Sequence, residues 1–213
     1  MKQDDAGLWE QASKQEINAL QKHGVWELCE LPPSWKAVSC RWVYRVKTNT
    51  DGSVHKYKAH LVAQGFSQQP HLDYTETFAP VAKFTSLHAV LAQAAAEDME
   101  VHHMDISSAF LNGDLEEETY MAQPEGFAAP GQEHLVCHLK KSIYGLKQSP
   151  RQWYKKLHPT FLALGFACCA SDHCVWIWAK DSIRVIIPAH GISLFTTGLW
   201  RTTTNKAKLA FGR

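Results

Sequence analysis

The spacing of hydrophobic positions predicts a helix at the start of the chain. Over residues 5–23, Trp9, Ile17 and Leu20 recur at intervals that place them on one helical face, with polar and charged residues around them. Gly24 follows directly, and glycine is common just beyond a helix C-terminus. The first element is therefore expected to be an amphipathic helix that buries one side.

An alternation of apolar and polar residues follows and predicts a β-hairpin. Residues 38–48 alternate Val, Cys, Trp and Tyr with Ser, Arg and Lys, which predicts the first strand. Asp51-Gly52 is a typical turn sequence, and residues 54–64 are expected to form the returning strand. Since side chains alternate between the two faces of a strand, the polar positions fall together. They are strongly basic: Arg41, Arg45, Lys47, Lys56 and Lys58. Such a ribbon is either a solvated hairpin or a finger that grips phosphates, and composition does not separate the two.

Beyond the hairpin, helices and strands alternate irregularly, which favours an α+β fold. One helix is expected from Thr85 or Ser86, either of which would cap it, to Glu97, and another through residues 151–161. Strands are expected at residues 25–31, 99–104, 120–121, 135–139, 175–178 and 183–187, the last two as a hairpin.

The most informative stretch is residues 104–127. The apolar run over residues 99–104 reads as a buried strand that ends on a single carboxylate, Asp105, and a short turn that exposes Phe110 follows. An acid at the end of a buried strand usually either binds a metal ion or caps the next helix. The local pattern leaves both roles open for Asp105.

Charge is unevenly distributed, although the net charge is only +1. Residues 36–60 hold six Lys or Arg against one acid, and residues 140–156 hold six against none. Between them, residues 97–125 hold nine Asp or Glu and no Lys or Arg. Basic flanks around an acidic centre suit a polyanion bound beside a metal site, and the alternative is solvated faces of mixed charge.

The cysteine pattern and the absence of a leader indicate an intracellular protein. The N-terminus has no apolar signal core, and no stretch has the length of a membrane span. Six cysteines show no disulfide framework. Cys168, Cys169, His173 and Cys174 lie close together, but adjacent cysteines are poor tetrahedral ligands, so reduced thiols are expected there rather than zinc.

Four blocks of sequence resemble the reverse transcriptase of copia-type long-terminal-repeat retrotransposons. They are YKAHLVAQGF at 57–66, DYTETFAPV at 73–81, the stretch 104–127, and KSIYGLKQSPR at 141–151. The resemblance implies a truncated right-hand polymerase with fingers and an incomplete palm, built from an antiparallel sheet with packed helices. The expected division is an N-terminal helix at 1–24, fingers and partial palm at 25–188, and a diverged tail at 189–213.

The resemblance also implies a set of site residues for nucleotidyl transfer by two Mg²⁺ ions. Asp105 is similar to the first catalytic carboxylate, with the Ile106 carbonyl as a further metal ligand. Phe110 resembles the side chain that excludes a 2′-hydroxyl, against the alternative of a core aromatic, and Lys58 resembles the cation that meets the triphosphate. The implied partners are deoxynucleotides and an RNA or DNA template–primer. The residues expected beside the template and new base pair are Gly145, Lys147, Gln148 and Arg151, of which the two cations are either phosphate contacts or solvated.

The sequence departs from the family where the second acidic motif belongs. Residues 182–213 contain no Asp or Glu, and His60 and His88 stand where the family usually has arginine. One carboxylate leaves two dications with most of their compensating charge missing, so the chain is expected to be catalytically inactive. The alternatives are a non-catalytic nucleic-acid-binding remnant and a functionless pseudogene product. In the last case, missing palm strands would expose Ile186, Ile187, Leu194 and Phe195.

Overall fold

The computed structural model describes residues 5–181 and 183–198 of the chain, which divides into two compact units. Unit 1 comprises Met1–Phe78 and Phe110–Trp153, and unit 2 comprises Ala79–Ala109 and Tyr154–Arg213. The expected division at residues 24 and 188 stays a prediction. Helices combined with antiparallel sheets confirm the α+β class.

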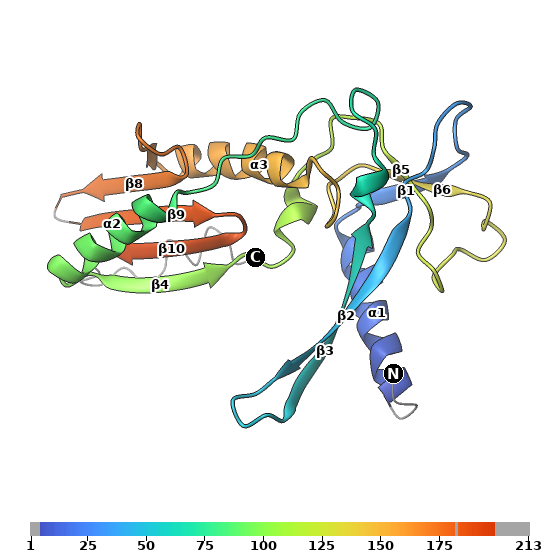
Figure 1. The fold of residues 1–213 in the computed structure, drawn as a ribbon, viewed down its shortest axis with the longest axis horizontal. Helices are drawn as coiled ribbons and strands as arrows, with labels where there is room; N and C mark the ends of the chain where they lie inside the picture. The colour runs from blue at the N-terminus through green and yellow to red at the C-terminus, as the bar shows by residue number, and fades with distance from the viewer. Residues whose placement is uncertain (1–4, 182, 199–213) are drawn as a thin grey trace. The chain divides into compact units, whose positions relative to one another are not determined.

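Unit 1 contains one long helix, a three-stranded antiparallel sheet in the order β1-β6-β5, and the two-stranded β2–β3 ribbon. Its elements are α1 (Ala6–Lys22), β1 (Trp26–Cys29), β2 (Cys40–Thr48), β3 (Val54–Ala63), η2 (Gly65–Ser67), β5 (Tyr120–Met121) and β6 (Val136–Leu139). A short helix, η3 (Ala109–Asn112), begins just before its second segment. Its core is Ile17, Leu20, Val25, Val38, Leu61, Ala63, Leu111, Met121, Cys137, Leu139, Ile143 and Leu146. The predicted first helix and hairpin are confirmed (Figure 1).

Helix α1 packs on the aromatic face of the ribbon. The Trp9 ring meets the rings of Tyr44 and Tyr57 edge-on, with centroids 5.2 and 4.5 Å away. Glu16 Oε1 also accepts a hydrogen bond from the backbone N–H of Leu61 on β3. The helix therefore covers one face of the ribbon and part of a strand edge that would otherwise be open to pairing with another chain.

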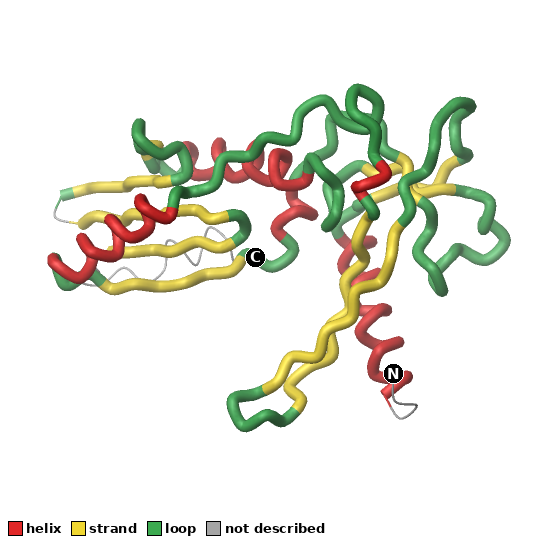
Figure 2. Tube along the Cα trace, viewed as in Figure 1, coloured by secondary structure: helices red, strands yellow, loops and turns green. Residues whose placement is uncertain are grey.

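Unit 2 is a five-stranded antiparallel sheet in the order β4-β10-β9-β8-β7, accompanied by helix α2. Its elements are α2 (Phe84–Ala96), β4 (Glu100–Asp105), β7 (Ala167–Cys168), β8 (Val175–Lys180), β9 (Ile183–His190) and β10 (Ser193–Gly198). Helix α3 (Ser149–Ala163) contributes residues to both units. Val90 of α2 packs against Val175 and Ile186 of the sheet. Apart from η2, the segment between β3 and α2 is loop and turn (Figure 2). No helix in the described part of the chain has the length and apolar character needed to cross a bilayer.

One expectation about burial in this sheet is wrong, and so is the exposure that the pseudogene alternative implied. Strand β4 was expected to be buried, yet most of it is exposed, including Val101 at 47%, because it is an edge strand of the described sheet. Conversely, Ile186, Ile187 and Leu194 are at most 4% exposed instead of lying bare. Strand β10 explains the second difference, since it pairs along its length with β4 on one side and with β9 on the other.

The expected cap of α2 is also wrong. The N-cap residue is Lys83, without a side-chain cap of its own, and its backbone N–H donates to Asp172 Oδ2 at 2.9 Å. The other carboxylate oxygen accepts from the N–H of Cys174 at 3.0 Å. Asp172 is far away in sequence and only 6% exposed, so a tertiary contact replaces the local hydroxyl cap.

Candidate functional site

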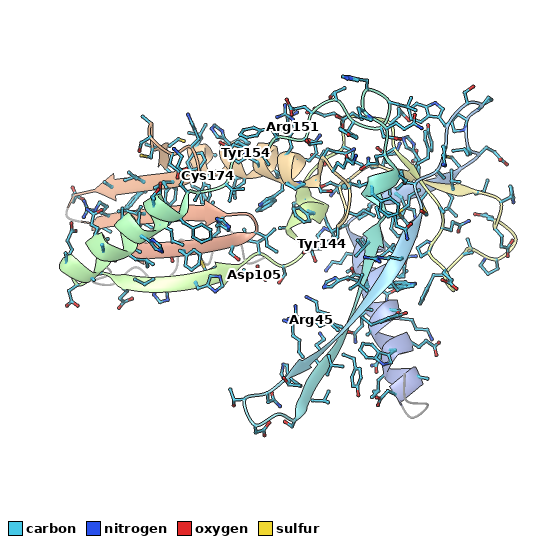
Figure 3. The ribbon with its side chains drawn as sticks, in the orientation of Figure 1. Arg45, Asp105, Tyr144, Arg151, Tyr154 and Cys174 are labelled. Carbon is cyan, nitrogen blue, oxygen red and sulfur yellow. The ribbon has the colours of Figure 1, made fainter. Side chains whose placement is uncertain are left out.

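The open face of the β2–β3 ribbon carries like charges directly opposite one another. The register pairs Arg45 with Lys58 and Lys47 with Lys56. Among the described residues, none of the four has an acidic partner within salt-bridge distance. Like charges at opposed positions destabilise a sheet, so this face carries an electrostatic cost in the free protein. Arg45 projects on the side of the ribbon away from α1 (Figure 3).

A glycine pins the 141–151 block to the end of β3. Gly145 has a φ of +94°, and a Cβ there would stand 2.0 Å from the carbonyl oxygen of Ala63. The neighbouring carbonyl of Tyr144 accepts a hydrogen bond from the Ala63 N–H at 2.8 Å. Only glycine permits both this backbone conformation and this approach. Gly145 thus sets the position of the loop.

The side chains of Lys147 and Gln148, in the same loop, contact other residues of unit 1. Gln148 is fully buried; its Oε1 accepts from Gln68 Nε2 at 3.1 Å, and its Nε2 donates to the Asp73 carbonyl at 3.0 Å. Lys147 Nζ lies 3.2 Å from the Tyr74 hydroxyl and 4.9 Å from the centroid of that ring. Both side chains tie the 141–151 block to the loop that follows β3.

Arg151 is also engaged within unit 1. Its Nη1 donates to the Phe78 carbonyl at 3.3 Å, and its side chain is half-buried. The Arg151 charge contributes to keeping the pKa of Glu76 below its usual range, after the larger effect of the backbone N–H groups of Phe78 and Thr77.

Phe110 belongs to a row of three aromatic rings, and the sequence did not predict that these rings lie together. The Phe110 and Tyr144 centroids lie 4.9 Å apart in an edge-on arrangement, and the Tyr144 and His60 centroids lie 5.4 Å apart. His60 Nδ1 is 3.1 Å from Glu16 Oε1. Phe110 was expected to be exposed, but it is half-buried. Tyr144 stands in a block that carried the resemblance, so a signal for it existed, but its contact with Phe110 is long-range.

In unit 2, Asp105 is the last residue of β4 and is exposed (Figure 3). Within the described residues its carboxylate makes no hydrogen bond or ion pair, so it caps no helix. The next residue, Ile106, donates its N–H to the Ile192 carbonyl at 3.2 Å. Of the two roles left open by the sequence, the cap is thereby wrong.

The positions beside Asp105 in the sheet hold no second carboxylate. Asp105 pairs with Ser193, and Ser193 pairs with His190 at the end of β9. Directly opposed residues project on the same face, so the row reads carboxylate, hydroxyl, imidazole. His190 Nδ1 lies 3.1 Å from the Ala82 carbonyl, which directs that ring nitrogen to the backbone.

This donor set does not fit a pair of magnesium ions. Mg²⁺ requires oxygen ligands in near-octahedral geometry, and two ions need several carboxylates to offset their charge. Among the described residues, no group of three or more His, Cys, Asp or Glu side chains is placed to hold a metal ion. Asp105 and the Ile106 carbonyl supply at most part of such a site.

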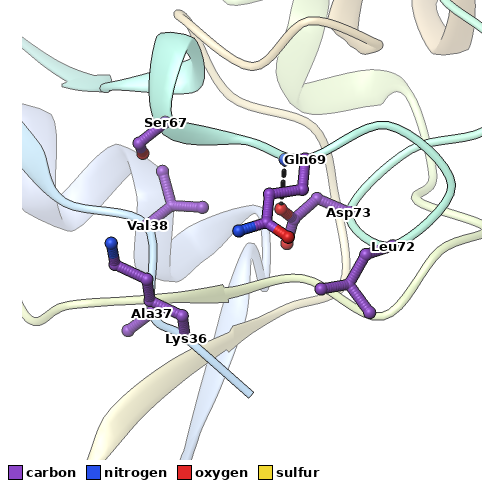
Figure 4. A pocket seen from close by; sticks show the side chains of 7 residues that line it. All are labelled: Lys36, Ala37, Val38, Ser67, Gln69, Leu72 and Asp73. Atoms are coloured by element: carbon purple, nitrogen blue, oxygen red, sulfur yellow. Dashed lines mark hydrogen bonds between the residues drawn. The ribbon is translucent and has the colours of Figure 1, made fainter. Parts of the chain in front are cut away.

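A small hollow in unit 1 lies apart from these residues (Figure 4). Asp73 in its wall is 5% exposed, and its Oδ2 already accepts from the Gln69 N–H at 2.7 Å. None of the expected site residues lines it. The lining residues are Lys36, Ala37, Val38, Ser67, Gln69, Leu72 and Asp73.

Comparison with known proteins gives a match over most of the chain. Residues 23–211 match the family described as "Reverse transcriptase (RNA-dependent DNA polymerase)". The chain is 46% identical over 165 residues to the Retrovirus-related Pol polyprotein from transposon TNT 1-94 of Nicotiana tabacum, covering 78% of this chain and 12% of that protein. It is 45% and 40% identical over 191 residues to the Pol polyproteins from transposons RE2 and RE1 of Arabidopsis thaliana, covering 89% of this chain and 13% of each. The chain therefore spans about an eighth of the length of these relatives.

Proposed function

This chain belongs to the reverse transcriptase (RNA-dependent DNA polymerase) family, in its copia-type branch, and on that premise we propose that it binds template–primer without polymerising unaided. In this proposal unit 1 serves as the fingers and unit 2 as a partial palm. The observation that carries it is the row Asp105–Ser193–His190, where a polymerase site needs further acids.

Charge is the physical reason for the proposed inactivity. Two-metal transfer holds the attacking and leaving oxygens between two dications, and clustered carboxylates offset the charge of those ions. Here Ser193 and His190 bring no negative charge to the row, and residues 182–213 contain no Asp or Glu to replace it. Asp105 and Ile106 would remain as ligands of a single, weakly held Mg²⁺ ion.

The ribbon supports the proposed binding of nucleic acid. Its opposed cations, Arg45 with Lys58 and Lys47 with Lys56, repel one another in the free protein. A phosphate chain relieves this repulsion and releases its own condensed counterions, which is the main source of sequence-independent affinity for nucleic acids. In this proposal Lys58 meets the phosphates of a nucleotide or primer.

The remaining expected residues receive distinct roles in the proposal. Phe110, with Tyr144 against it, faces the sugar. Gly145 allows the loop to approach β3, and Gln148 holds the loop from within because it is fully buried. Lys147 and Arg151 are engaged by Tyr74 and Phe78 and act first as supports of the loop.

Salt titration of binding tests the nucleic-acid part of the proposal. Lys56→Gln and Lys58→Gln should each weaken binding to a primer–template and reduce the slope of log K against log salt by about 0.7–0.9 per lost phosphate contact. Lys22→Gln, in the last turn of α1, is the matched control and should leave the slope unchanged. Absence of wild-type binding even at low salt would refute the proposal.

Primer extension tests the catalytic part. The wild-type chain and Asp105→Ala should give the same background level of extension on an RNA template with Mg²⁺ or Mn²⁺. Extension by the wild type above the Asp105→Ala level would show that other groups complete the metal site, and the proposed inactivity would then be wrong.

A further inference from the structure

The two most exposed large hydrophobic side chains in the described part of the chain stand on one loop of unit 1. They are Phe66, 81% exposed, and Phe78, 69% exposed, both in the loop segment between β3 and α2. Single exposed apolar residues are common on protein surfaces and need no explanation by themselves. What distinguishes these two is that they are aromatic and that a cation contacts the backbone near each of them, Lys147 at the Gln68 carbonyl and Arg151 at the Phe78 carbonyl.

The backbone around Phe66 is tightly fixed. Phe66 lies in η2, beside Gly65, where a Cβ would stand 2.1 Å from the Gly145 carbonyl oxygen. Two residues later, Gln68 is 3% exposed and bonded to Gln148. The Gln68 carbonyl also lies 3.5 Å from Lys147 Nζ. The exposed ring therefore stands on a backbone segment that these contacts hold in place.

The backbone at Phe78, further along the same segment, is held in a similar way. Its N–H donates to Glu76 Oε1 at 2.9 Å, and its carbonyl accepts from Arg151 Nη1 at 3.3 Å. The Glu76 carboxylate is occupied by this N–H and by that of Thr77, and Arg151 offsets its charge. Because the backbone is already fixed, little backbone entropy is lost when a ligand packs on the ring.

We propose that Phe66 and Phe78 are stacking platforms for unpaired bases, so that this loop binds a single-stranded stretch of nucleic acid. The inference rests on the proposed nucleic-acid binding and adds the class of strand and the residues that contact it. Aromatic side chains beside cations are the combination by which proteins hold single strands without reading their sequence. Lys147 and Arg151, which contact the backbone carbonyls of Gln68 and Phe78, place positive charge at this loop and favour a polyanion over an apolar protein segment.

Binding to two DNA ligands tests the inference. One is a primer–template with a single-stranded 5′ overhang and the other is a blunt duplex of the same paired sequence. Phe66→Leu and Phe78→Leu, which keep apolar bulk but remove the ring, should each weaken overhang binding about tenfold and leave blunt-duplex binding unchanged. Phe84→Leu, at a ring that is 65% exposed in unit 2, is the matched control and should change neither. Quenching of 2-aminopurine in the overhang should be lost in the first two variants only.

The possible results separate this inference from the proposed function. If the overhang gives no gain over the blunt duplex, or if the leucine variants bind the overhang normally while Lys58→Gln weakens binding, the stacking role is wrong and the ribbon's role stands. If the wild type binds neither ligand, both are wrong. If the leucine variants bind DNA normally but Phe66 and Phe78 become protected on addition of a protein partner, the loop is a protein-docking site and the inference is overturned.

Discussion

Asp105 lies directly opposite Ser193 in the antiparallel pair of β4 and β10. The position across the strand from the exposed carboxylate is thus filled by a hydroxyl. The side chains at such opposed positions share one face and have Cβ atoms about 4.5–5.5 Å apart, within reach of a common ion.

Replacing Ser193 with aspartate should create a pair of carboxylates able to bind one divalent ion. We expect Ser193→Asp to bind Mn²⁺ at least about tenfold more tightly than the wild type, because two charged oxygen ligands replace one. Isothermal titration calorimetry or electron paramagnetic resonance of Mn²⁺ measures the affinity. Val101→Asp, at an exposed position of the same strand as Asp105, is the control for added charge alone. Equal Mn²⁺ affinities for the two variants would contradict the opposed geometry.

Gly145→Ala should destabilise the protein far more than an alanine at another positive-φ glycine. At Gly126, with φ +77° and no atom within 4 Å of the position that a Cβ would take, alanine should cost only the backbone strain of about 1–2 kcal/mol. At Gly145 the clash with the Ala63 carbonyl adds to that strain, and a total loss above about 3 kcal/mol is expected. Urea denaturation of both variants gives the difference, and similar losses would mean that the loop moves away freely.

Asp172→Ala should destabilise unit 2 and alter its response to acid. Burial raises the pKa of Asp172, but hydrogen bonds from Ser86 and the N–H groups of Lys83 and Cys174 outweigh burial and leave the pKa below its usual value. A lowered folded-state pKa means that the stabilisation is present above the unfolded-state pKa of about 3.9 and is lost as pH falls through the folded-state value.

The unfolding free energy of the wild type should therefore decrease on acidification below about pH 4. At neutral pH the unfolding free energy of Asp172→Ala should be lower than that of the wild type by about 1–3 kcal/mol, and it should decrease less on acidification. Thermal melts across this pH range provide the measurement. Parallel acid profiles for the two proteins would show that Asp172 is not the group responsible.

Cys169 should react with alkylating reagents before the buried cysteines do. The hydrogen bond with Ser171, with 3.1 Å between Sγ and Oγ, lowers the pKa of the Cys169 thiol, whereas burial raises the pKa of Cys137 and of Cys174 to about 12. The thiolate is the reactive form, so the lower pKa gives faster reaction near neutral pH. Mass spectrometry after timed iodoacetamide treatment should find Cys169 modified first. Ser171→Ala should slow that reaction, and an unchanged rate would exclude the hydrogen bond as its cause.

The elements that were predicted well are those whose pattern is complete within a short segment. The buried face of α1, which carries Ile17 and Leu20, follows from the helical spacing of apolar residues. The β2–β3 ribbon follows from the alternation of apolar and polar residues at every second position. The placement of five cations on one face of that ribbon follows from the same alternation. The family, too, is readable from residues 57–66, 73–81, 104–127 and 141–151 alone, and the comparisons confirm it.

The predictions that failed concern contacts between distant segments. Apolar composition indicated a buried β4, but the strand's exposure depends on where it stands in the sheet order. The cap of α2 comes from Asp172, and the ring against Phe110 comes from Tyr144. Both partners are distant in sequence, so no local sequence pattern predicts them.

The sequence by itself therefore determined the helical and strand segments, their apolar faces and the family. It also showed that no Asp or Glu follows residue 181. Only the tertiary structure decided that Asp105 lies opposite Ser193, that Gln148 is buried, and that Phe66 is exposed to water. The reason is physical: periodicity reports which side of an element avoids water, whereas the neighbour on that side is selected by packing across the whole chain.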